Sequence, residues 1–144
     1  MMMRIEELTT EADFREAFPV FKELRPYVDE ARFFERLKVM LPRGYRLFTL
    51  RDGIDNCVVA VAGVELTETM RGRQLHVHEL ITTETVRSKG YGAAMMHYLE
   101  QYARSQECDI LELSSNVTRE DAHRFYESKI GMMRTSYLFR KQLR

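Results

Sequence analysis

The chain has 144 residues, of which 44% are hydrophobic and 31% are charged, which is typical of a folded protein and argues against a disordered one. No run approaches the roughly 20 apolar residues that a membrane-spanning helix needs, and the 22 basic residues are balanced by 22 acidic ones, whereas nucleic-acid binders usually carry a basic excess. The length fits one domain over residues 1–144, and a polar start without a signal-peptide core predicts a cytoplasmic protein.

Residues 4–8 predict a short strand, and two helices follow it. Thr10 and Asp29 are suitable N-caps, because their side-chain oxygens can accept an unpaired backbone N–H of the first helical turn. After each cap, apolar residues recur at the three-and-four spacing of a helix that packs on a core. These residues are Phe14, Ala17, Phe18 and Phe21 in the first helix, and Phe33, Phe34, Leu37, Met40 and Leu41 in the second.

The middle of the chain changes to strand-like patterns. Residues 45–51 and 57–67 are rich in Val, Leu, Phe, Tyr and Thr, and the segment 52–56 between them has residues that tolerate a turn. These two runs predict a hairpin. A third long strand is expected from Leu75 to about Thr83.

The last part of the chain predicts alternating helices and strands. A helix starts at Tyr91, and the short strand 109–115 completes a strand–helix–strand unit whose two strands should be parallel. A final helix carries Ala122, Phe125, Tyr126 and Ile130 and stops at Gly131. Residues 132–143 then predict a last strand, which gives the order β-α-α-β-β-β-α-β-α-β.

One loop carries a chemical signal. The stretch Arg87-Ser88-Lys89-Gly90-Tyr91-Gly92-Ala93 joins the third long strand to a helix. Unpaired N–H groups and the helix dipole favour an anion at such a helix start, glycines let the backbone approach it closely, and the two basic residues supply countercharge. From the loop alone, phosphate recognition and a plain turn both stay open. No Walker loop is present, and Met95 replaces the third glycine of a dinucleotide fingerprint.

The pattern from Arg87 to Gly92 resembles the acetyl-CoA loop of the GNAT N-acetyltransferases. The stretch 79–82 is similar to that family's central strand, and 122–127 with Gly131 is similar to its later Phe-Tyr region. The resemblance implies an α/β fold with a mixed, mostly antiparallel central sheet that is splayed at the acetyl-CoA strand and has helices on both faces. It also implies acetyl-CoA as cosubstrate, with main-chain contacts to its pantetheine arm from Leu80, Ile81 and Thr82 and pyrophosphate contacts from Arg87, Ser88, Lys89, Gly90, Tyr91, Gly92 and Ala93.

Acetyl transfer to an amine needs a base for the ammonium and an acid for the departing thiolate. The resemblance implies Glu79 as the base, and strand alternation groups Glu79 with Leu75, Val77 and Ile81 in an apolar setting. It also implies that the phenol of Tyr126 protonates the thiolate. The alternatives without catalysis are an ion pair with an arginine for Glu79 and a core aromatic for Tyr126.

We therefore expect an N-acetyltransferase that moves an acetyl group to a primary amine of an unidentified small molecule or peptide, by direct attack in a ternary complex. The alternative is a catalytically weak CoA-binding sensor or interaction module on the same fold. No metal is expected, because His76 and His78 have no third ligand, and Cys57 and Cys108 lack metal-ligand spacing. Neither nucleic acid nor membrane is an expected partner, and base rates for small enzymes allow a homodimer.

Overall fold

The computed structural model describes residues 3–87 and 89–144. The chain divides into two compact units, Met1–Leu113 and Ser114–Arg144. The first unit contains the sheet, three helices and the glycine loop, and the second contains Tyr126. The elements follow one another as strand, two helices, three strands, helix, strand and helix, which confirms the predicted order up to its last strand.

The first strand and the two helices after it form as predicted. Thr10 caps the first helix, because its Oγ1 accepts the backbone N–H of Asp13 at 3.1 Å. Asp29 caps the second helix in the same way, since its Oδ1 accepts the backbone N–H of Arg32 at 2.8 Å. The elements β1, α1 and α2 cover Arg4–Glu7, Glu11–Leu24 and Glu30–Met40.

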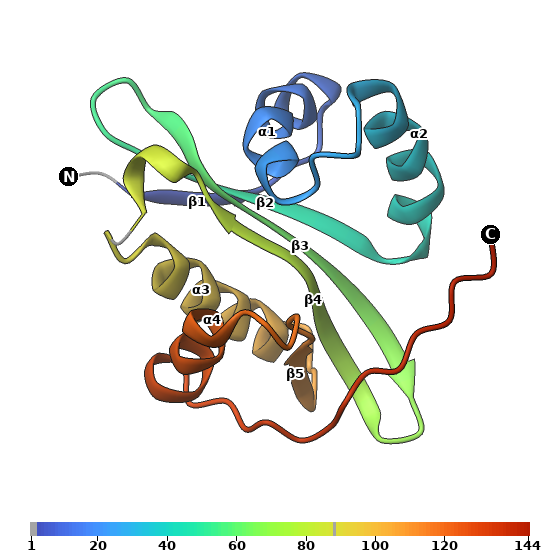
Figure 1. Cartoon of the computed structure of the whole chain (residues 1–144). Helices are drawn as coiled ribbons and strands as arrows, with labels where there is room; N and C mark the ends of the chain where they lie inside the picture. The colour runs from blue at the N-terminus through green and yellow to red at the C-terminus, as the bar shows by residue number, and fades with distance from the viewer. Residues whose placement is uncertain (1–2, 88) are drawn as a thin grey trace. The chain divides into compact units, whose positions relative to one another are not determined.

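Five strands form one sheet in the order β1-β2-β3-β4-β5 (Figure 1). Neighbouring strands are antiparallel except β4 and β5, which are parallel as the strand–helix–strand pattern predicts. The sheet is therefore mixed and mostly antiparallel. The elements β2, β3, β4, α3 and β5 cover Tyr45–Asp52, Cys57–Thr69, Gly72–Thr82, Tyr91–Ser105 and Ile110–Leu113, and two short 3-10 turns, η1 and η2, cover Leu41–Arg43 and Glu84–Val86.

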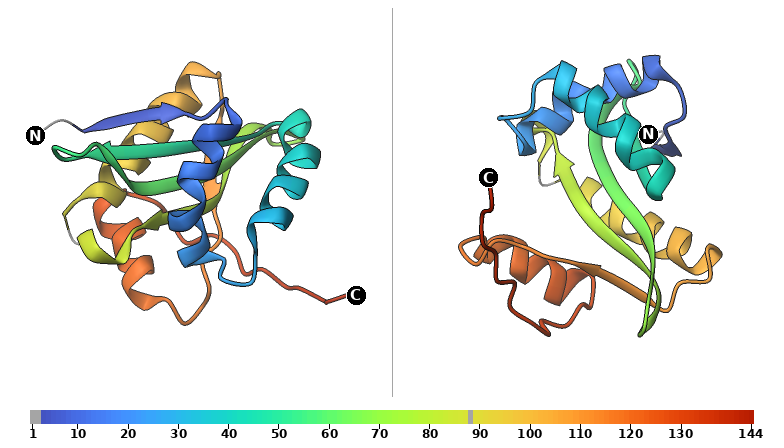
Figure 2. Two further views of the ribbon diagram at one scale, coloured as in Figure 1. Left: turned by 90° about the horizontal axis from the view of Figure 1, so that it is seen from above. Right: turned by 90° about the vertical axis from the view of Figure 1, so that its right-hand side faces the viewer.

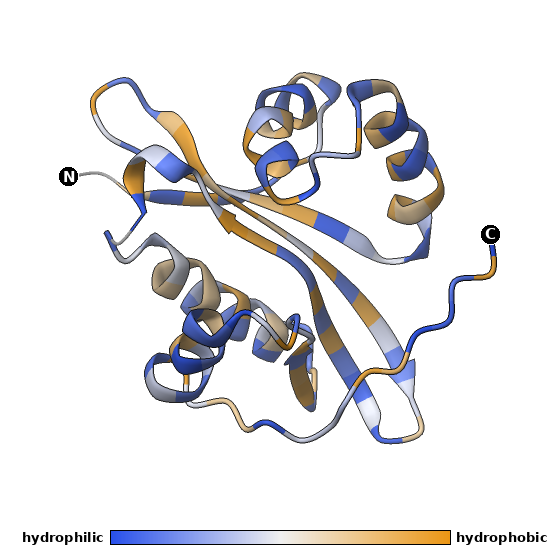
Figure 3. Ribbon diagram, viewed as in Figure 1, coloured by the Kyte–Doolittle hydropathy of each residue, from blue (hydrophilic) through white to orange (hydrophobic). Residues whose placement is uncertain are grey.

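Helices cover both faces of this sheet. In Figures 1 and 2, α1 and α2 lie on one face and α3 lies on the other. Figure 3 shows both polar and apolar residues on α1, α2 and α3, and their apolar residues can pack on the sheet. The core between the sheet and the first two helices consists of Leu8, Phe14, Ala17, Phe18, Val20, Phe21, Phe33, Leu37, Tyr45, Leu47, Val61 and Ile81.

The register between β3 and β4 shifts at His78, and this shift decides which way Glu79 faces. Val77 pairs with Val64 and Glu79 pairs with Gly63, so His78 is an extra residue in β4. Paired residues of antiparallel strands share a face, whereas consecutive residues such as Gly63 and Val64 face opposite sides. Glu79 therefore faces away from Val77. The predicted alternation is wrong here because a β-bulge interrupts the period of two.

The bulge turns Glu79 toward the face that α1 and α2 cover. Leu47 pairs with Gly63, the partner of Glu79, and Leu47 belongs to the core beneath these two helices. Ile81 belongs to the same core. The predicted grouping of Glu79 is thus confirmed for Ile81 and wrong for Leu75, which shares the face of Val77.

The strand β5 pairs with only the first part of β4. The pairs run from Gln74 with Ile110 to Val77 with Leu113, whereas β4 continues to Thr82. Within the described residues of the first unit, no strand pairs with this later part of β4 on the side away from β3. This divergence is the splay that the family resemblance implies.

The second unit has one short helix and a π-helical turn. The helix α4 covers Glu120–Arg124, and the turn η3 follows directly over Phe125–Lys129. Gly131, with φ +78°, ends this region. Residues 132–144 form no strand, so the predicted last strand is wrong. Its apolar residues favour an extended chain, but a strand also needs a neighbour that accepts and donates its backbone hydrogen bonds, and local sequence does not supply one.

Candidate active site

Glu79 is a buried carboxylate held by two side chains, and it is 8% exposed. The phenol of Tyr45 in β2 donates a 2.5 Å hydrogen bond to Oε1 of Glu79. Arg25, which follows α1, donates from Nη2 to Oε2 of Glu79 at 3.3 Å and to the carbonyl oxygen of His78 at 3.0 Å. Glu79 thus has two polar partners, and the ion pair with an arginine that the sequence left as an alternative is present.

Tyr45 stays a neutral hydrogen-bond donor in this arrangement. Burial, together with the adjacent Glu79 carboxylate, holds the pKa of the Tyr45 phenol well above its usual value, and Arg25 offsets a part of this effect. A neutral phenol keeps the proton that it donates to Oε1 of Glu79. The pair therefore fixes the orientation of the carboxylate.

Gly63 makes room for this pair. A Cβ at residue 63 would collide with Oε1 of Glu79 and with the hydroxyl oxygen of Tyr45. The φ of Gly63 is not in the left-handed region, so the requirement for glycine is one of space. Glycine within a strand often marks such a close approach, and here the approaching groups come from β2 and β4 on either side.

A pocket of about 130 Å³ opens beside Glu79. Glu79 and Tyr45, from the sheet, form its polar wall. The other lining residues come from α1, α2 and the segment between these helices, and most of them are apolar. The further lining residues are Phe21, Val28, Phe33, Arg36, Leu37 and Met40.

The glycine loop leads into the N-terminus of α3. Gly90 has φ +84°, and a Cβ on it would meet no atom within 4 Å, so the space beside this helix start is open. The amide of Ala94 is the first that bonds back, to the oxygen of Gly90 at 3.0 Å, and the three amides before it have no partner inside the helix. Exposed backbone donors and the helix dipole fit a diphosphate here.

The loop is also tied to the sheet. The buried phenol of Tyr91 donates to Oδ2 of the buried Asp52 at 2.6 Å. Oδ1 of the same carboxylate accepts the backbone N–H of Gly53 at 2.8 Å, in the turn between β2 and β3. One carboxylate thus joins the start of α3 to the β2–β3 hairpin.

The Acetyltransferase (GNAT) family profile matches residues 6–132. The chain belongs to this family of acetyltransferases. The uncharacterized N-acetyltransferase YhdJ of Bacillus subtilis strain 168 is 34% identical over 142 residues, which are 97% of this chain and 99% of that protein. The GNAT chain is therefore an N-acetyltransferase by family.

Two solved structures of enzymes share the fold of this GNAT chain. An aminoglycoside N-acetyltransferase in complex with CoA has a TM-score of 0.84 at 10% identity, over 99% of this chain and 95% of that one. The glucosamine-6-phosphate N-acetyltransferase of Arabidopsis thaliana has a TM-score of 0.78 at 19% identity, over 100% of both chains. At these identities the likeness shows the fold alone, and it confirms the sheet with helices that the sequence predicts.

The predicted cofactor residues of the GNAT acetyltransferase fall into two groups. Leu80, Ile81 and Thr82 lie in the part of β4 that continues beyond β5, and the carbonyl oxygen of Thr82 accepts a 3.2 Å hydrogen bond from Nε of Arg87. Arg87 and Lys89 are exposed, whereas the side chain of Tyr91 is buried. Gly90 is the N-cap of α3, and Gly92 and Ala93 are in its first turn. The predicted contact from Ser88 lies outside the described residues.

Tyr126 of the GNAT chain is in the π-helical turn η3 of the second unit. Burial raises the pKa of its phenol, and the charge of Arg119 offsets a part of this effect. π-Helical turns often occur at functional sites. The role of Tyr126 stays a prediction.

The sequence did not single out Arg25, Gly63 or Asp52 as site residues. Gly63 carried a usable signal, because a glycine in a run of Val and Ala marks a bulge or a close approach. Arg25 and Asp52 had none, since their partners lie 54 and 39 residues away in the chain.

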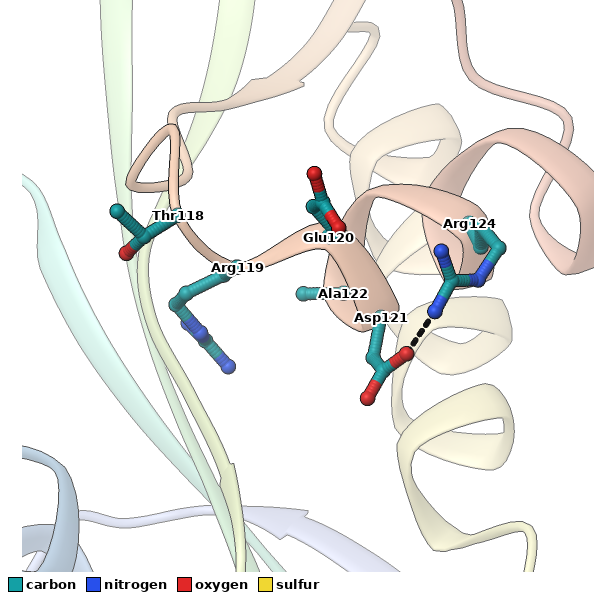
Figure 4. A pocket seen from close by; sticks show the side chains of 6 residues that line it. All are labelled: Thr118, Arg119, Glu120, Asp121, Ala122 and Arg124. Carbon is teal, nitrogen blue, oxygen red and sulfur yellow. Dashed lines mark hydrogen bonds and ion pairs between the residues drawn. The ribbon is translucent and has the colours of Figure 1, made fainter.

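The second unit of the GNAT chain has its own pocket, of about 390 Å³. Figure 4 shows its lining and the ion pair between Arg124 and Asp121. The pocket lies beside the five-residue helix α4 and the two residues before it, and neither Tyr126 nor any residue of the glycine loop lines it. Its lining residues are Thr118, Arg119, Glu120, Asp121, Ala122 and Arg124.

Residues 3–87 and 89–144 contain neither a cluster of metal-binding side chains nor a membrane-spanning helix. No three His, Cys, Asp or Glu side chains gather there in a way that could bind a metal ion. His76 and His78 each contact a different carboxylate, at 3.3 Å from Glu112 and 2.8 Å from Glu65. No helix in these ranges is long and apolar enough to cross a bilayer.

Proposed function

We propose that the chain transfers the acetyl group of acetyl-CoA to a primary amine, by direct attack of the amine in a ternary complex. The observation that carries this proposal is the position of Glu79, whose oriented carboxylate lines a pocket on the α1–α2 face while its own strand diverges from β5. A base beside an amine-sized pocket and a stretch of β4 free for a ligand are what such a reaction needs.

When bound, acetyl-CoA supplies the acetyl group as a reactive thioester. The main chain of Leu80, Ile81 and Thr82 would hold its pantetheine arm, because this part of β4 has no strand neighbour on one side in the first unit. Backbone N–H groups from Gly90 to Ala93 would hold the diphosphate, and Arg87, Ser88 and Lys89 belong to the same proposed loop. The open space beside Gly90 supports this fit.

Two residues would move protons. Glu79 accepts a proton from the ammonium of the acceptor, directly or through a water, which leaves a neutral amine to form the new C–N bond. As the C–S bond breaks, the phenol of Tyr126 would donate its proton to the sulfur, and the phenolate would regain a proton when the attacking nitrogen loses its second one to become the amide. The raised pKa of this phenol keeps it protonated near neutral pH. Arg25 and Tyr45 orient Glu79 and touch no reacting atom.

Release of free thiol tests this proposal. Purified protein with acetyl-CoA and a panel of primary amines should release thiol in an amine-dependent way, and heat stability should rise with CoA. Glu79→Gln and Tyr126→Phe should each lower kcat by about 10²-fold or more while the Kd for CoA stays within about twofold. Loss of CoA binding in both variants, with kcat unchanged at saturation, would contradict the assigned roles.

A second candidate is a CoA-binding sensor or interaction module with weak turnover. One observation favours it: both oxygens of Glu79 already have partners, in Tyr45 and Arg25, as in a structural ion pair. This function predicts a heat-stability gain with CoA and no amine-dependent thiol release. The same assay therefore separates the two functions.

Three wider expectations belong to the proposal. A single domain is supported by the family match, which runs across the boundary at Leu113. A homodimer is supported by three consecutive exposed apolar residues in the second unit, Tyr137, Leu138 and Phe139, because exposed apolar surface often marks an interface. Sedimentation would test it, with a monomer mass counting against the dimer. The cytoplasmic location and the absence of nucleic acid stay predictions.

A further inference from the structure

The pocket beside Glu79 has one polar wall and several apolar ones. Glu79 and Tyr45 form the polar wall, and both are nearly inaccessible to solvent. Phe21, Phe33 and Leu37 are buried apolar residues of the core that α1 and α2 share with the sheet. A ligand in the pocket would therefore meet the Glu79 carboxylate and the Tyr45 phenol on one side and mostly apolar side chains elsewhere, with Arg36 as the one further charged group.

The size of the pocket limits what can enter. Its volume is about 130 Å³, and a cavity of roughly 150 Å³ lined by apolar side chains holds one benzene ring in a protein core. The part of the amine's body that lies inside the pocket is thus about six carbon atoms. Hydroxyl groups on this body would lose water without gaining partners, because the apolar walls offer none.

Arg36 sets the charge at the exposed side of the pocket. It is the one basic side chain among the lining residues that the structure describes, and it is exposed. Among the described residues it forms no ion pair. A second ammonium on the acceptor would meet this guanidinium and be repelled, whereas a neutral or anionic end would not.

We propose that the acceptor is a monoamine on a compact apolar body of about six carbons, with its amine at Glu79 and its body among Phe33, Leu37 and Met40. This inference rests on the proposed function and narrows its substrate class. Amino sugars and polyamines are disfavoured, the former by the apolar walls and the latter by Arg36.

A matched series of amines tests the proposal. The kcat/KM for hexylamine should be at least about tenfold higher than that for 1,6-diaminohexane, which differs only in a second ammonium. The difference in kcat/KM between hexylamine and glucosamine should be larger still. Arg36→Glu should narrow the gap between the two hexyl amines. Equal or better use of glucosamine or 1,6-diaminohexane by the wild type would overturn the proposal while leaving acetyl transfer intact.

A pocket-filling variant adds a structural control. Met40 lines the pocket and is half-buried, whereas the adjacent Val39 is exposed and does not line it. Met40→Trp should lower kcat/KM for hexylamine by about tenfold without changing the Kd for CoA, and Val39→Trp should change neither. Equal kcat/KM in wild type and Met40→Trp would overturn the proposal.

A direct binding measurement keeps the pocket testable even when no amine is acetylated. In protein with 13C-labelled methionine methyl groups, hexylamine should shift the NMR signal of Met40 and leave that of Met95, which is fully buried and does not line the pocket. An unmoved Met40 signal at saturating hexylamine would overturn the pocket proposal. A shifted Met40 signal without thiol release would refute the proposed function alone.

Discussion

The phenol of Tyr91 donates a 2.6 Å hydrogen bond to the carboxylate of Asp52, which lies 39 residues earlier in the chain. Tyr91 is the first residue of α3 and Asp52 is the last residue of β2. This bond fixes the helix start that carries the proposed diphosphate site to the end of a core strand. Both side chains are buried, so the bond does not face solvent.

Removing this hydrogen bond should weaken the binding of acetyl-CoA and leave the rate of the chemical step nearly unchanged. Tyr91→Phe keeps the ring but loses the donor, so the start of α3 is held less firmly, and the KM for acetyl-CoA should rise about fivefold, the size expected for one hydrogen bond, with kcat nearly unchanged. Steady-state thiol release measures both constants. Tyr98→Phe on the same helix is the control, because no hydrogen bond from its phenol exists among the described residues. A fall in kcat alone would count against a positioning role for Tyr91.

The hydrogen bond between Tyr91 and Asp52 should also affect how the free energy of unfolding falls at acidic pH. The hydrogen bond from Tyr91, with a further one from the Gly53 amide, lowers the pKa of Asp52. A carboxyl with a lowered folded pKa contributes stability above its unfolded pKa, about 3.9 for Asp, and loses it as pH falls through the folded value. Tyr91→Phe should therefore reduce the free energy of unfolding at pH 6 and flatten its decline below about pH 4. Urea unfolding from pH 2 to 6 would show this, and an unchanged acid slope would contradict it.

Local patterns in the sequence were sufficient to predict most of the helices and strands. The caps Thr10 and Asp29 formed, because an N-cap depends only on residues within one turn. The strand–helix–strand unit formed with parallel strands for a similar reason, since chain connectivity restricts its topology. The family resemblance supplied the splay of β4 from β5.

Features that depend on partners distant in sequence were not predictable in the same way. The extra residue His78 reverses the face of Glu79, and an alternating pattern gives no sign of such a bulge. The ion pair with Arg25 joins elements 54 residues apart. Residues 132–143 looked like a strand, yet they form none, and no strand among the described residues pairs with them. Glu79 was thus correctly located in β4, whereas its particular partners Arg25 and Tyr45 were not predicted.

Gly63→Ala should impair catalysis by displacing the base. The added methyl would occupy the space where Glu79 and Tyr45 meet, and a displacement of about 1 Å at a catalytic group can cost about 10²-fold in rate. We expect kcat to fall by about ten- to a hundredfold with the Kd for CoA unchanged. Ala62→Gly is the matched control, because it changes one methyl on the opposite face of the same strand. A Gly63→Ala enzyme with wild-type kcat would show that the orientation of Glu79 does not matter.

Phe33 should be the aromatic residue whose loss destabilises the α1–α2 face most. Its ring packs on Phe18 and Phe21, with centroid distances of 5.1 and 4.9 Å, and it is 3% exposed. Phe33→Ala should therefore lower the free energy of unfolding by about 3–5 kcal/mol, since it leaves a cavity among these rings. Phe34→Ala provides the comparison, because Phe34 is only half-buried and lies against the Arg15 guanidinium. Urea denaturation at neutral pH measures both variants, and equal losses would mean that the core does not centre on Phe33.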